Sequence, residues 1–273
     1  MSINLNTVLL EQDVVRLLCF AAVLIVMLSW ELAAPKRGFN IPRRQRWLNN
    51  LGLMVLNTVL LRLLFPTAAF GIALYAQTKQ WGLFNQLEVP LWAAFLICLV
   101  ALDFVIYLQH RLFHTLPVLW RIHRVHHADR EFDVSTGVRF HPIEIVLSMI
   151  IKGVAIIILG APAQAVVAFE VILSATSLFN HGNVRLHRTV EAYLRWMLVT
   201  PDMHRVHHSI DMDETNHNFG FNLTCWDRLF NTYRAQPRQS HETMAIGVKS
   251  LVCPRVCQGL WGMLTMPFVK NTP

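Results

Sequence analysis

Three short clusters contain eight of the thirteen histidines: HRLFH at 110–114, HRVHH at 123–127 and HRVHH again at 204–208. Residues three or four positions apart share one face of a helix, so each cluster directs its imidazoles toward a common point. Neutral imidazole is the commonest metal-binding side chain, and this many packed rings without a metal would lack hydrogen-bond partners. We therefore predict a metal site made by His110, His114, His123, His126, His127, His204, His207 and His208.

The number of histidines indicates more than one metal ion. A closed tetrahedral zinc site needs four ligands and would leave the other histidines unused. His181, beside Asn180 at the end of an apolar stretch, is the best candidate for a ninth ligand, which gives four to five ligands per metal. Imidazole binds zinc, copper, iron and nickel alike, so the spacing by itself does not choose the metal.

His141 is a weaker candidate ligand. It precedes Pro142, and a residue before proline favours extended backbone. Three roles stay open for it: a metal ligand, a hydrogen-bond donor behind the ligands, or an ordinary residue at the membrane interface.

Two carboxylates, Asp103 and Glu170, lie inside apolar stretches. Charged residues within membrane spans are costly and are functional candidates by default; the alternative is a paired or protonated packing residue. Helical spacing aligns Asp103 with Tyr107 and Glu170 with His181. Ligating imidazoles usually donate their second N–H to a carboxylate or carbonyl. We expect Asp103 to hydrogen-bond a histidine of another cluster or Tyr107, and Glu170 to do likewise or to line a lipid pocket.

The composition indicates a membrane protein. Of 273 residues, 54% are hydrophobic and only 15% are charged, which is too apolar for an ordinary soluble domain. Several apolar runs approach the roughly 20 residues that cross a bilayer. We predict an all-α integral membrane fold with about four transmembrane helices and a cytoplasmic, histidine-rich helical cap. The expected segments are 13–34, 48–76 (interrupted by Pro66), 90–109, and a hairpin of 143–159 and 163–180 joined by a turn at 160–162.

The distribution of charge predicts the orientation. The formal net charge is +7, and Lys and Arg gather at 36–46 and 111–139. Cytoplasmic loops are enriched in these residues, so we place both segments and the metal site in the cytoplasm and the N-terminus outside. The C-terminus is also expected inside, with the proline-broken stretch 245–268 lying at the membrane interface. Because the basic residues form no stripe or known nucleic-acid motif, no nucleic-acid partner is expected.

Local signals add two expectations. Thr200 followed by Pro201 predicts the start of a helix that carries the third cluster. Arg111, Arg124 and Arg205, each directly after a histidine, are expected to face lipid phosphates or to act as positioning charges at the membrane surface, with a substrate headgroup as the alternative partner. Because the sequence shows no linker, residues 1–273 are expected to form a single domain. The histidine clusters lie within about 95–235 of this domain.

The order HxxxH, HxxHH, HxxHH, with a hairpin between the last two, resembles the membrane-bound fatty acid hydroxylase and sterol desaturase superfamily. The clusters are also similar to those of alkylglycerol monooxygenases. Phe219 and Asn231 depart from the tyrosine and glycine of the family pattern. Four further segments carry the resemblance: RFHPIE at 139–144, NHGN at 180–183, NFG at 218–220 and WDRLF at 226–230.

This resemblance implies a centre of two iron ions that uses dioxygen to hydroxylate an aliphatic C–H bond of a fatty acyl, sterol or alkylglycerol lipid. A desaturase with the same centre is the alternative, and other metals such as zinc would be found in some purified samples. Electrons are expected from a separate ferredoxin-type or cytochrome b5-type donor, and the location is expected to be a bacterial inner membrane. A non-enzymatic metal store or transporter is a distant alternative, because a transporter would carry its ligands along a path through the membrane midplane.

Overall fold

The computed structural model describes residues 5–251 and 254–269, and every regular element in this part of the chain is helical. This confirms the predicted all-α fold class. The long helices are α1 (Leu5–Ala33), α2 (Arg43–Leu64), α3 (Ala68–Thr78), α5 (Leu91–Thr115), α7 (Pro142–Leu159) and α8 (Ala163–Asn180). The shorter ones are α4 (Leu83–Gln86), α6 (Pro117–His127), η1 (Val134–Val138), α9 (Arg188–Leu194), α10 (Pro201–His207), α11 (Met212–Thr215), α12 (Cys225–Leu229), α13 (Pro254–Gln258), α14 (Leu260–Thr265) and η2 (Met266–Phe268).

Within the described residues, five apolar helical stretches are long enough to cross a membrane. They are Leu9–Ala33, Arg43–Gln86, Leu91–Thr115, Pro142–Leu159 and Ala163–Asn180. Both members of the predicted hairpin are among them, and each has 18 residues, a rise of about 27 Å that nearly matches a bilayer core. Large apolar side chains stay exposed on the outer faces, as at Leu63 (74%) and Trp92 (68%). Lipid would cover such surfaces, and the chain is therefore an integral membrane protein.

The breaks between these helices follow from proline and glycine. Helix α2 ends at Leu64, just before Pro66, and α3 begins at Ala68. Gly160 ends α7 with a φ of 64°, a left-handed conformation that glycine adopts with little strain. Pro162 then precedes α8. The predicted interruption and the predicted hairpin turn are both confirmed.

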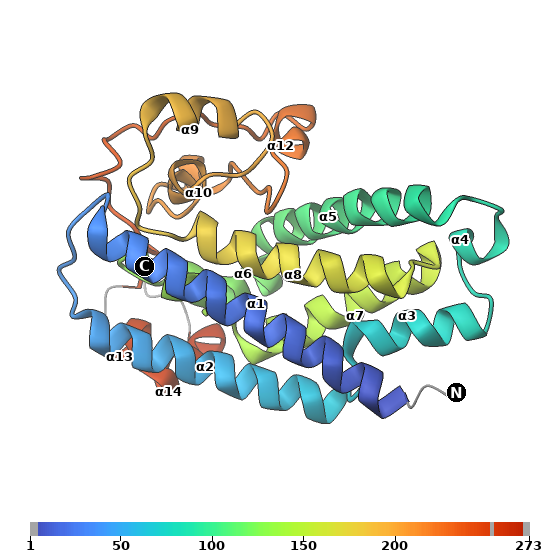
Figure 1. The fold of residues 1–273 in the computed structure, drawn as a ribbon. Helices are drawn as coiled ribbons and strands as arrows, with labels where there is room; N and C mark the ends of the chain where they lie inside the picture. Colours follow the sequence, from blue (N-terminus) through green and yellow to red (C-terminus); the bar gives the residue numbers. More distant parts are fainter. Residues whose placement is uncertain (1–4, 252–253, 270–273) are drawn as a thin grey trace.

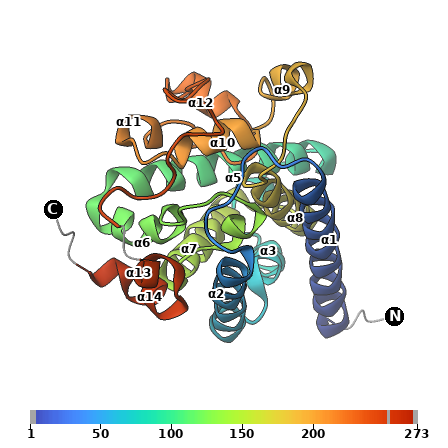
Figure 2. The ribbon, with the colours of Figure 1, turned by 90° about the vertical axis from the view of Figure 1, so that its left-hand side faces the viewer.

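The apolar core lies where α3, α5, α7 and α8 meet. Its buried members include Phe70, Cys98, Leu102, Ile156 and Phe169. The α1–α2 connection, the end of α5, α6 and the end of α8 lie toward the same end of the helix bundle (Figure 1), and Figure 2 shows α5 running across the directions of α1 and α2. Figure 2 views the bundle from this end, and helices α9 to α12 lie above α5 there, along one side of the bundle. All three histidine clusters belong to elements at this end.

The segment 245–268 contains only short helices among its described residues; 252 and 253 lie outside them. Met263 and Met266 pack with Leu53 of α2 and Val125 of α6, whereas Trp261 is 77% exposed. Short helices with two exposed aromatic residues, Trp261 and Phe268, are compatible with the predicted place at the membrane interface, which stays a prediction.

Candidate metal centre

The first two clusters come together because α5 and α6 pack against each other. His110 and His114 lie one turn apart near the end of α5, and both are buried. Pro117 occupies the first turn of α6, where its missing N–H leaves no hydrogen bond unmade. The chain turns back there, so His123 of α6 lies edge to face with His110, with ring centroids 5.0 Å apart.

Capping residues position the other histidines. The Thr200 side chain accepts a hydrogen bond from the Met203 N–H, and Pro201 begins α10, as the sequence predicts. Helix α10 carries the third cluster in its last turn. His181 caps the end of α8, and its Nδ1 lies 2.7 Å from the Ser177 carbonyl oxygen.

The nine histidines form two groups, and the candidate donor atoms within each group lie within 4.8 Å of one another. The five-histidine group contains His110, His114, His123, His127 and His207, and the four-histidine group contains His126, His181, His204 and His208. In the cluster 123–127, the first and last histidines belong to the five-histidine group and the middle one to the four-histidine group. In the cluster 204–208 the assignment is reversed, and only the middle histidine belongs to the five-histidine group. The groups are adjacent, since the rings of His127 and His208 stack with centroids 4.4 Å apart. Five and four donors are enough for two metal ions.

Backbone carbonyl oxygens fix the tautomers of several rings. Each carbonyl can only accept a hydrogen bond, so the Nδ1 atom beside it carries the proton. The unprotonated Nε2 atom then faces the interior of the group, as a metal ligand must. The pairs are His110 with Phe219 at 2.8 Å, His126 with Arg139 at 3.2 Å, His181 with Ser177 at 2.7 Å and His207 with His217 at 2.8 Å.

The inner nitrogen atoms have the surroundings of metal ligands. Nε2 of His181 lies 3.1 Å from Nε2 of His126, and the Nε2 atoms of His110 and His207 are 3.0 Å apart. Unprotonated nitrogens this close repel each other unless a cation lies between them. Within the described residues, both ring nitrogens of His114 are also buried without a hydrogen-bond partner, and buried polar atoms normally have one. The donor set therefore fits a pair of metal ions.

The electrostatics also favour cations. Burial lowers the pKa of His207 to about 3 and that of His181 to about 4. Burial, followed by the neighbouring imidazoles, lowers the pKa of His126 and His204 well below its usual range. These rings are neutral at physiological pH, which is the state that binds metals. The C-terminal ends of α6, α8 and α10 lie at the site, and helix C-termini carry partial negative charge.

A carboxylate that the sequence analysis did not single out contacts one of these rings. Glu144, in the first turn of α7, is buried, and its Oε1 lies 2.6 Å from Nδ1 of His123. A carboxylate in this position fixes the orientation of a ligating ring and raises its basicity. Glu144 belongs to the segment 139–144 that carries the family resemblance. Its position three residues after His141 was the sequence feature that could have identified it as a candidate site residue.

The predicted partners of Asp103 were wrong. Its carboxylate accepts hydrogen bonds from the Leu223 N–H at 3.2 Å and from the Trp226 indole at 2.8 Å. The Tyr107 hydroxyl pairs instead with Thr232, 3.0 Å away. This face of α5 packs against the segment 219–232, whose Phe219 carbonyl accepts from His110, so Asp103 ties that segment to α5.

Asp227 holds the same segment from within. Its carboxylate accepts hydrogen bonds from the backbone N–H groups of Phe219 and Gly220, at 2.8 and 2.7 Å. Thr232 donates a third, at 2.7 Å. Burial raises the pKa of Asp227 to about 6, against the opposing effect of these bonds. The carbonyl that orients His110 is therefore held by a buried carboxylate that the sequence analysis quoted only within a motif.

Glu170 and His141 lie outside both groups. Glu170 contacts Lys152 and lies 3.1 Å from Arg16, and it lines a cavity between the helices. His141 accepts a hydrogen bond from the Ile143 N–H at the start of α7, and its other nitrogen lies 3.1 Å from the Leu264 carbonyl oxygen. Since both ring nitrogens face the backbone, we leave His141 out of the proposed ligand set.

Two of the arginines that follow histidines do not have the expected exposure. Arg124 is buried and donates to the carbonyl oxygens of Met266 and Val269. Arg205 is also buried, and it pairs with Asp202 of the same helix. The expectation that Arg124 and Arg205 face lipid phosphates was wrong, because residues 266–269 enclose Arg124 and the Phe132 ring packs against Arg205.

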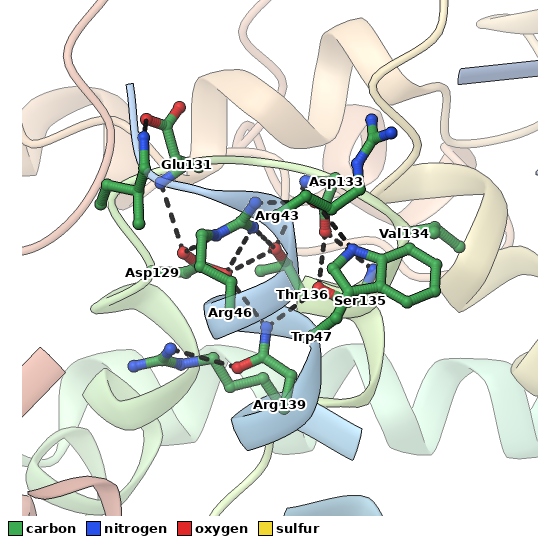
Figure 3. Close-up of polar contacts among 12 residues, drawn as sticks. Arg43, Arg46, Trp47, Asp129, Glu131, Asp133, Val134, Ser135, Thr136 and Arg139 are labelled. Atoms are coloured by element: carbon green, nitrogen blue, oxygen red, sulfur yellow. Dashed lines mark hydrogen bonds and ion pairs between the residues drawn. The ribbon is translucent and has the colours of Figure 1, made fainter. Parts of the chain in front are cut away.

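A buried ionic network braces the segment between the second cluster and α7 (Figure 3). Arg46 of α2 forms two hydrogen bonds to Asp129, both of 2.9 Å, and one of 2.7 Å to Asp133. All three side chains have no exposed surface. Arg139 donates to the Val125 carbonyl at 2.7 Å, and its own carbonyl orients His126. The network thus connects α2 to the backbone around the four-histidine group.

The comparisons with known proteins agree with this geometry. The family model for fatty acid hydroxylase matches residues 95–232, half of the chain, and this segment contains all nine grouped histidines. The chain belongs to the fatty acid hydroxylase family. The predicted superfamily resemblance is confirmed, and the matched residues agree closely with the predicted 95–235.

Relatives of this fatty acid hydroxylase chain include an ornithine lipid hydroxylase of Rhizobium tropici, 33% identical over 76% of this chain and 60% of the relative. An alkylglycerol monooxygenase of Xenopus tropicalis is 27% identical over 62% of this chain and 37% of its own. A fatty acid hydroxylase of a Lecanicillium species is 26% identical over 52% and 42%. The chain therefore spans between about one third and three fifths of the length of these relatives. No solved structure matches it.

Proposed function

We propose that this protein hydroxylates an aliphatic C–H bond of a membrane lipid at a centre of two iron ions. The observation that carries the proposal is the pair of adjacent histidine groups with inward-facing, unprotonated nitrogens. Two irons held there would supply dioxygen activation and C–H oxidation, which no side chain provides. Iron rests on the family membership, because imidazole binds several metals. The names of the relatives support a lipid substrate.

The chain's own residues bring the lipid to the metal groups. A cavity of about 320 Å³ lies between the helices, and His110 and His123 line one part of it. Apolar side chains such as Ile106, Phe113 and Leu173 line much of the rest. An acyl or alkyl chain would displace water from this cavity and present one carbon to the ring nitrogens. Glu144, which holds His123, also lines the cavity.

The balance of the reaction requires an electron donor. One lipid C–H, one dioxygen, two electrons and two protons give one hydroxyl group and one water. We propose that a separate ferredoxin-type or cytochrome b5-type protein supplies the electrons. A desaturase with the same centre remains the alternative, and it would release two waters and form a carbon–carbon double bond. A metal transporter is disfavoured, because the end of α5, α6, the end of α8 and α10, which carry the histidines, lie toward one end of the bundle instead of along a path through it (Figure 1).

The test is comparative lipidomics of cells that produce the protein and cells that produce its His110→Ala variant. The variant is the matched control, because it places the same helices in the membrane but lacks one proposed ligand. We expect a lipid heavier by one oxygen only with the unchanged protein. A lipid lighter by two hydrogens would favour the desaturase. Identical lipids in both cultures would contradict a lipid-oxidising function.

We further propose that the protein lies in a bacterial inner membrane with the metal end cytoplasmic and the N-terminus outside. Cysteines introduced one at a time at the exposed residues Glu88, just after α4, and Arg188, at the start of α9, test this in a background in which Cys19, Cys225 and Cys253 are replaced by serine. A membrane-impermeant maleimide applied to intact cells should label Glu88→Cys only. Labelling of Arg188→Cys alone would show that the protein has the opposite orientation in the membrane.

A further inference from the structure

A cluster of charged side chains extends from the buried Lys152 and Glu170 to the exposed Arg62, at a distance from the histidines. Lys152 of α7 and Arg16 of α1 both pair with Glu170 of α8. Arg62 of α2 pairs with Asp13, which also faces Arg16. Glu170 lies 11 residues before His181, about 16 Å along α8. Ionisable groups within membrane spans are costly and are retained where they serve a ligand or a pathway.

This charged cluster has an excess of positive charge. Its cations are Arg16, Arg62 and Lys152, and its anions are Asp13 and Glu170. The side chains of Glu170 and Lys152 are only 5% and 11% exposed, so water screens them weakly. One positive charge therefore remains unbalanced within the cluster, in surroundings where an anion would be attracted strongly.

The cluster borders the cavity that leads to the metal centre. Arg16, Lys152 and Glu170 line the same cavity as His110 and His123. A second cavity of about 430 Å³ lies among residues of α1, α2 and α8, and it shares Arg16 and Glu170 with the first. The outward faces of α1 and α2 carry exposed apolar residues such as Leu17 and Leu63. Lipid beside these helices is therefore close to both cavities.

Acceptor atoms without partners lie between the two ends of the first cavity. Within the described residues, Asn57 Oδ1, Gln109 Oε1 and Glu144 Oε2 are buried and receive no hydrogen bond. All three residues line this cavity and are less than 10% exposed. A buried acceptor without a donor is unfavourable by about the strength of a hydrogen bond. These acceptors fit a ligand that also carries hydrogen-bond donors, such as hydroxyl or amide N–H groups, in addition to its hydrocarbon part.

We propose that Arg16 and Lys152 form a subsite for the acidic group, a carboxylate or a phosphate, of the lipid that the metal centre oxidises. Glu170 holds the two cations in place and limits the positive charge that they present. The acidic group binds at this subsite while another part of the lipid lies at His110 and His123. The inference rests on the proposed function for the role of the ligand, but it concerns binding alone.

Equilibrium binding to the purified protein in neutral detergent tests the subsite without turnover. The probes are two matched pairs: radiolabelled palmitate with methyl palmitate, and hexadecyl phosphate with 1-hexadecanol. We expect one acidic lipid to bind about tenfold or more tightly than its neutral partner, as for a hydrogen bond to a charged group. The pair with the larger preference identifies the acidic group. Equal affinity within both pairs would overturn the proposal.

Two variants change the charge in opposite directions. Lys152→Met makes the cluster neutral and leaves Glu170 paired with Arg16, so the preference for the acidic lipid should fall about tenfold. Glu170→Gln adds one positive charge, so the preference should be kept or increase. Arg44→Gln is the matched control, because Arg44 is exposed and lines neither cavity. A merely structural role would make both cluster variants lose affinity for acidic and neutral lipids alike.

The outcomes remain distinguishable if one variant does not fold. Glu170→Gln alone decides the question, since a falling preference for the acidic lipid would contradict the subsite. The assay needs no metal. Loss of charge selectivity would leave the proposed metal centre standing, and selective binding by a protein without oxidising activity would leave the subsite standing.

Discussion

If the proposed centre of two metal ions is present, the His126→Ala protein is expected to lose about one of them, whereas the His207→Ala protein keeps about two. His126 belongs to the four-histidine group, so its removal leaves three donors. His207 belongs to the five-histidine group, and its removal leaves four, which complete a tetrahedral site. The affected site in His126→Ala should bind metal at least 10-fold more weakly, the lower limit for loss of a supporting residue.

Elemental analysis after washing with a chelator measures this difference. Circular dichroism on the same samples shows whether the helices are intact. Each variant is the matched control for the other, because both changes remove one buried imidazole. Both variants should lose oxidising activity, since both alter the centre. Equal metal content in the two variants would contradict the division into groups of four and five.

The Arg46→Met protein is expected to be less stable by about 3–5 kcal/mol, the usual cost of removing one partner of a buried ion pair. Asp129 and Asp133 have no exposed surface and would lose their shared guanidinium (Figure 3). Burial alone would raise the pKa of Asp129, yet Arg46 holds it below its usual range. Without Arg46, a buried carboxylate must bind a proton or stay unpaired.

Unfolding in mixed micelles measures the free energy, and Arg44→Met is the control. Arg44 is the exposed neighbour in the first turn of α2, and a surface change of this kind alters stability by no more than about 0.5 kcal/mol. Arg46→Lys should recover only part of the loss, because an ammonium group lacks the planar fork that donates to both aspartates. Equal stability of the two methionine variants would show that the network contributes little.

The sequence by itself determined the features that depend on neighbours along the chain. Apolar runs of sufficient length, broken at Pro66 and Gly160, defined the membrane helices. Helical spacing predicted that the histidines of each cluster share one helix face, and the position of His181 at the end of the hairpin predicted it as a further ligand. These conclusions hold because helix formation and bilayer crossing follow from local composition and periodicity.

Contacts between distant segments were decided only by the tertiary structure. Helical spacing places His123, His126 and His127 close together, but the packing of α5, α8 and α10 around α6 sends the middle ring to a different group from its neighbours. The same packing places His123 within hydrogen-bond distance of Glu144, and it places the Asp103 carboxylate where it accepts a hydrogen bond from Trp226.

Burial of charge was equally beyond the sequence. Arg46 stood among the basic residues that predict a cytoplasmic loop, yet it lies inside α2 with no exposed surface. The sequence did not predict a role for Lys152, which lies in an apolar run. Only the packing of α8 against α7 shows that Glu170 is its partner. The sequence around a charged residue does not identify its partner, because ion pairs form between helices that are far apart in sequence, as for Arg16 of α1 and Glu170 of α8.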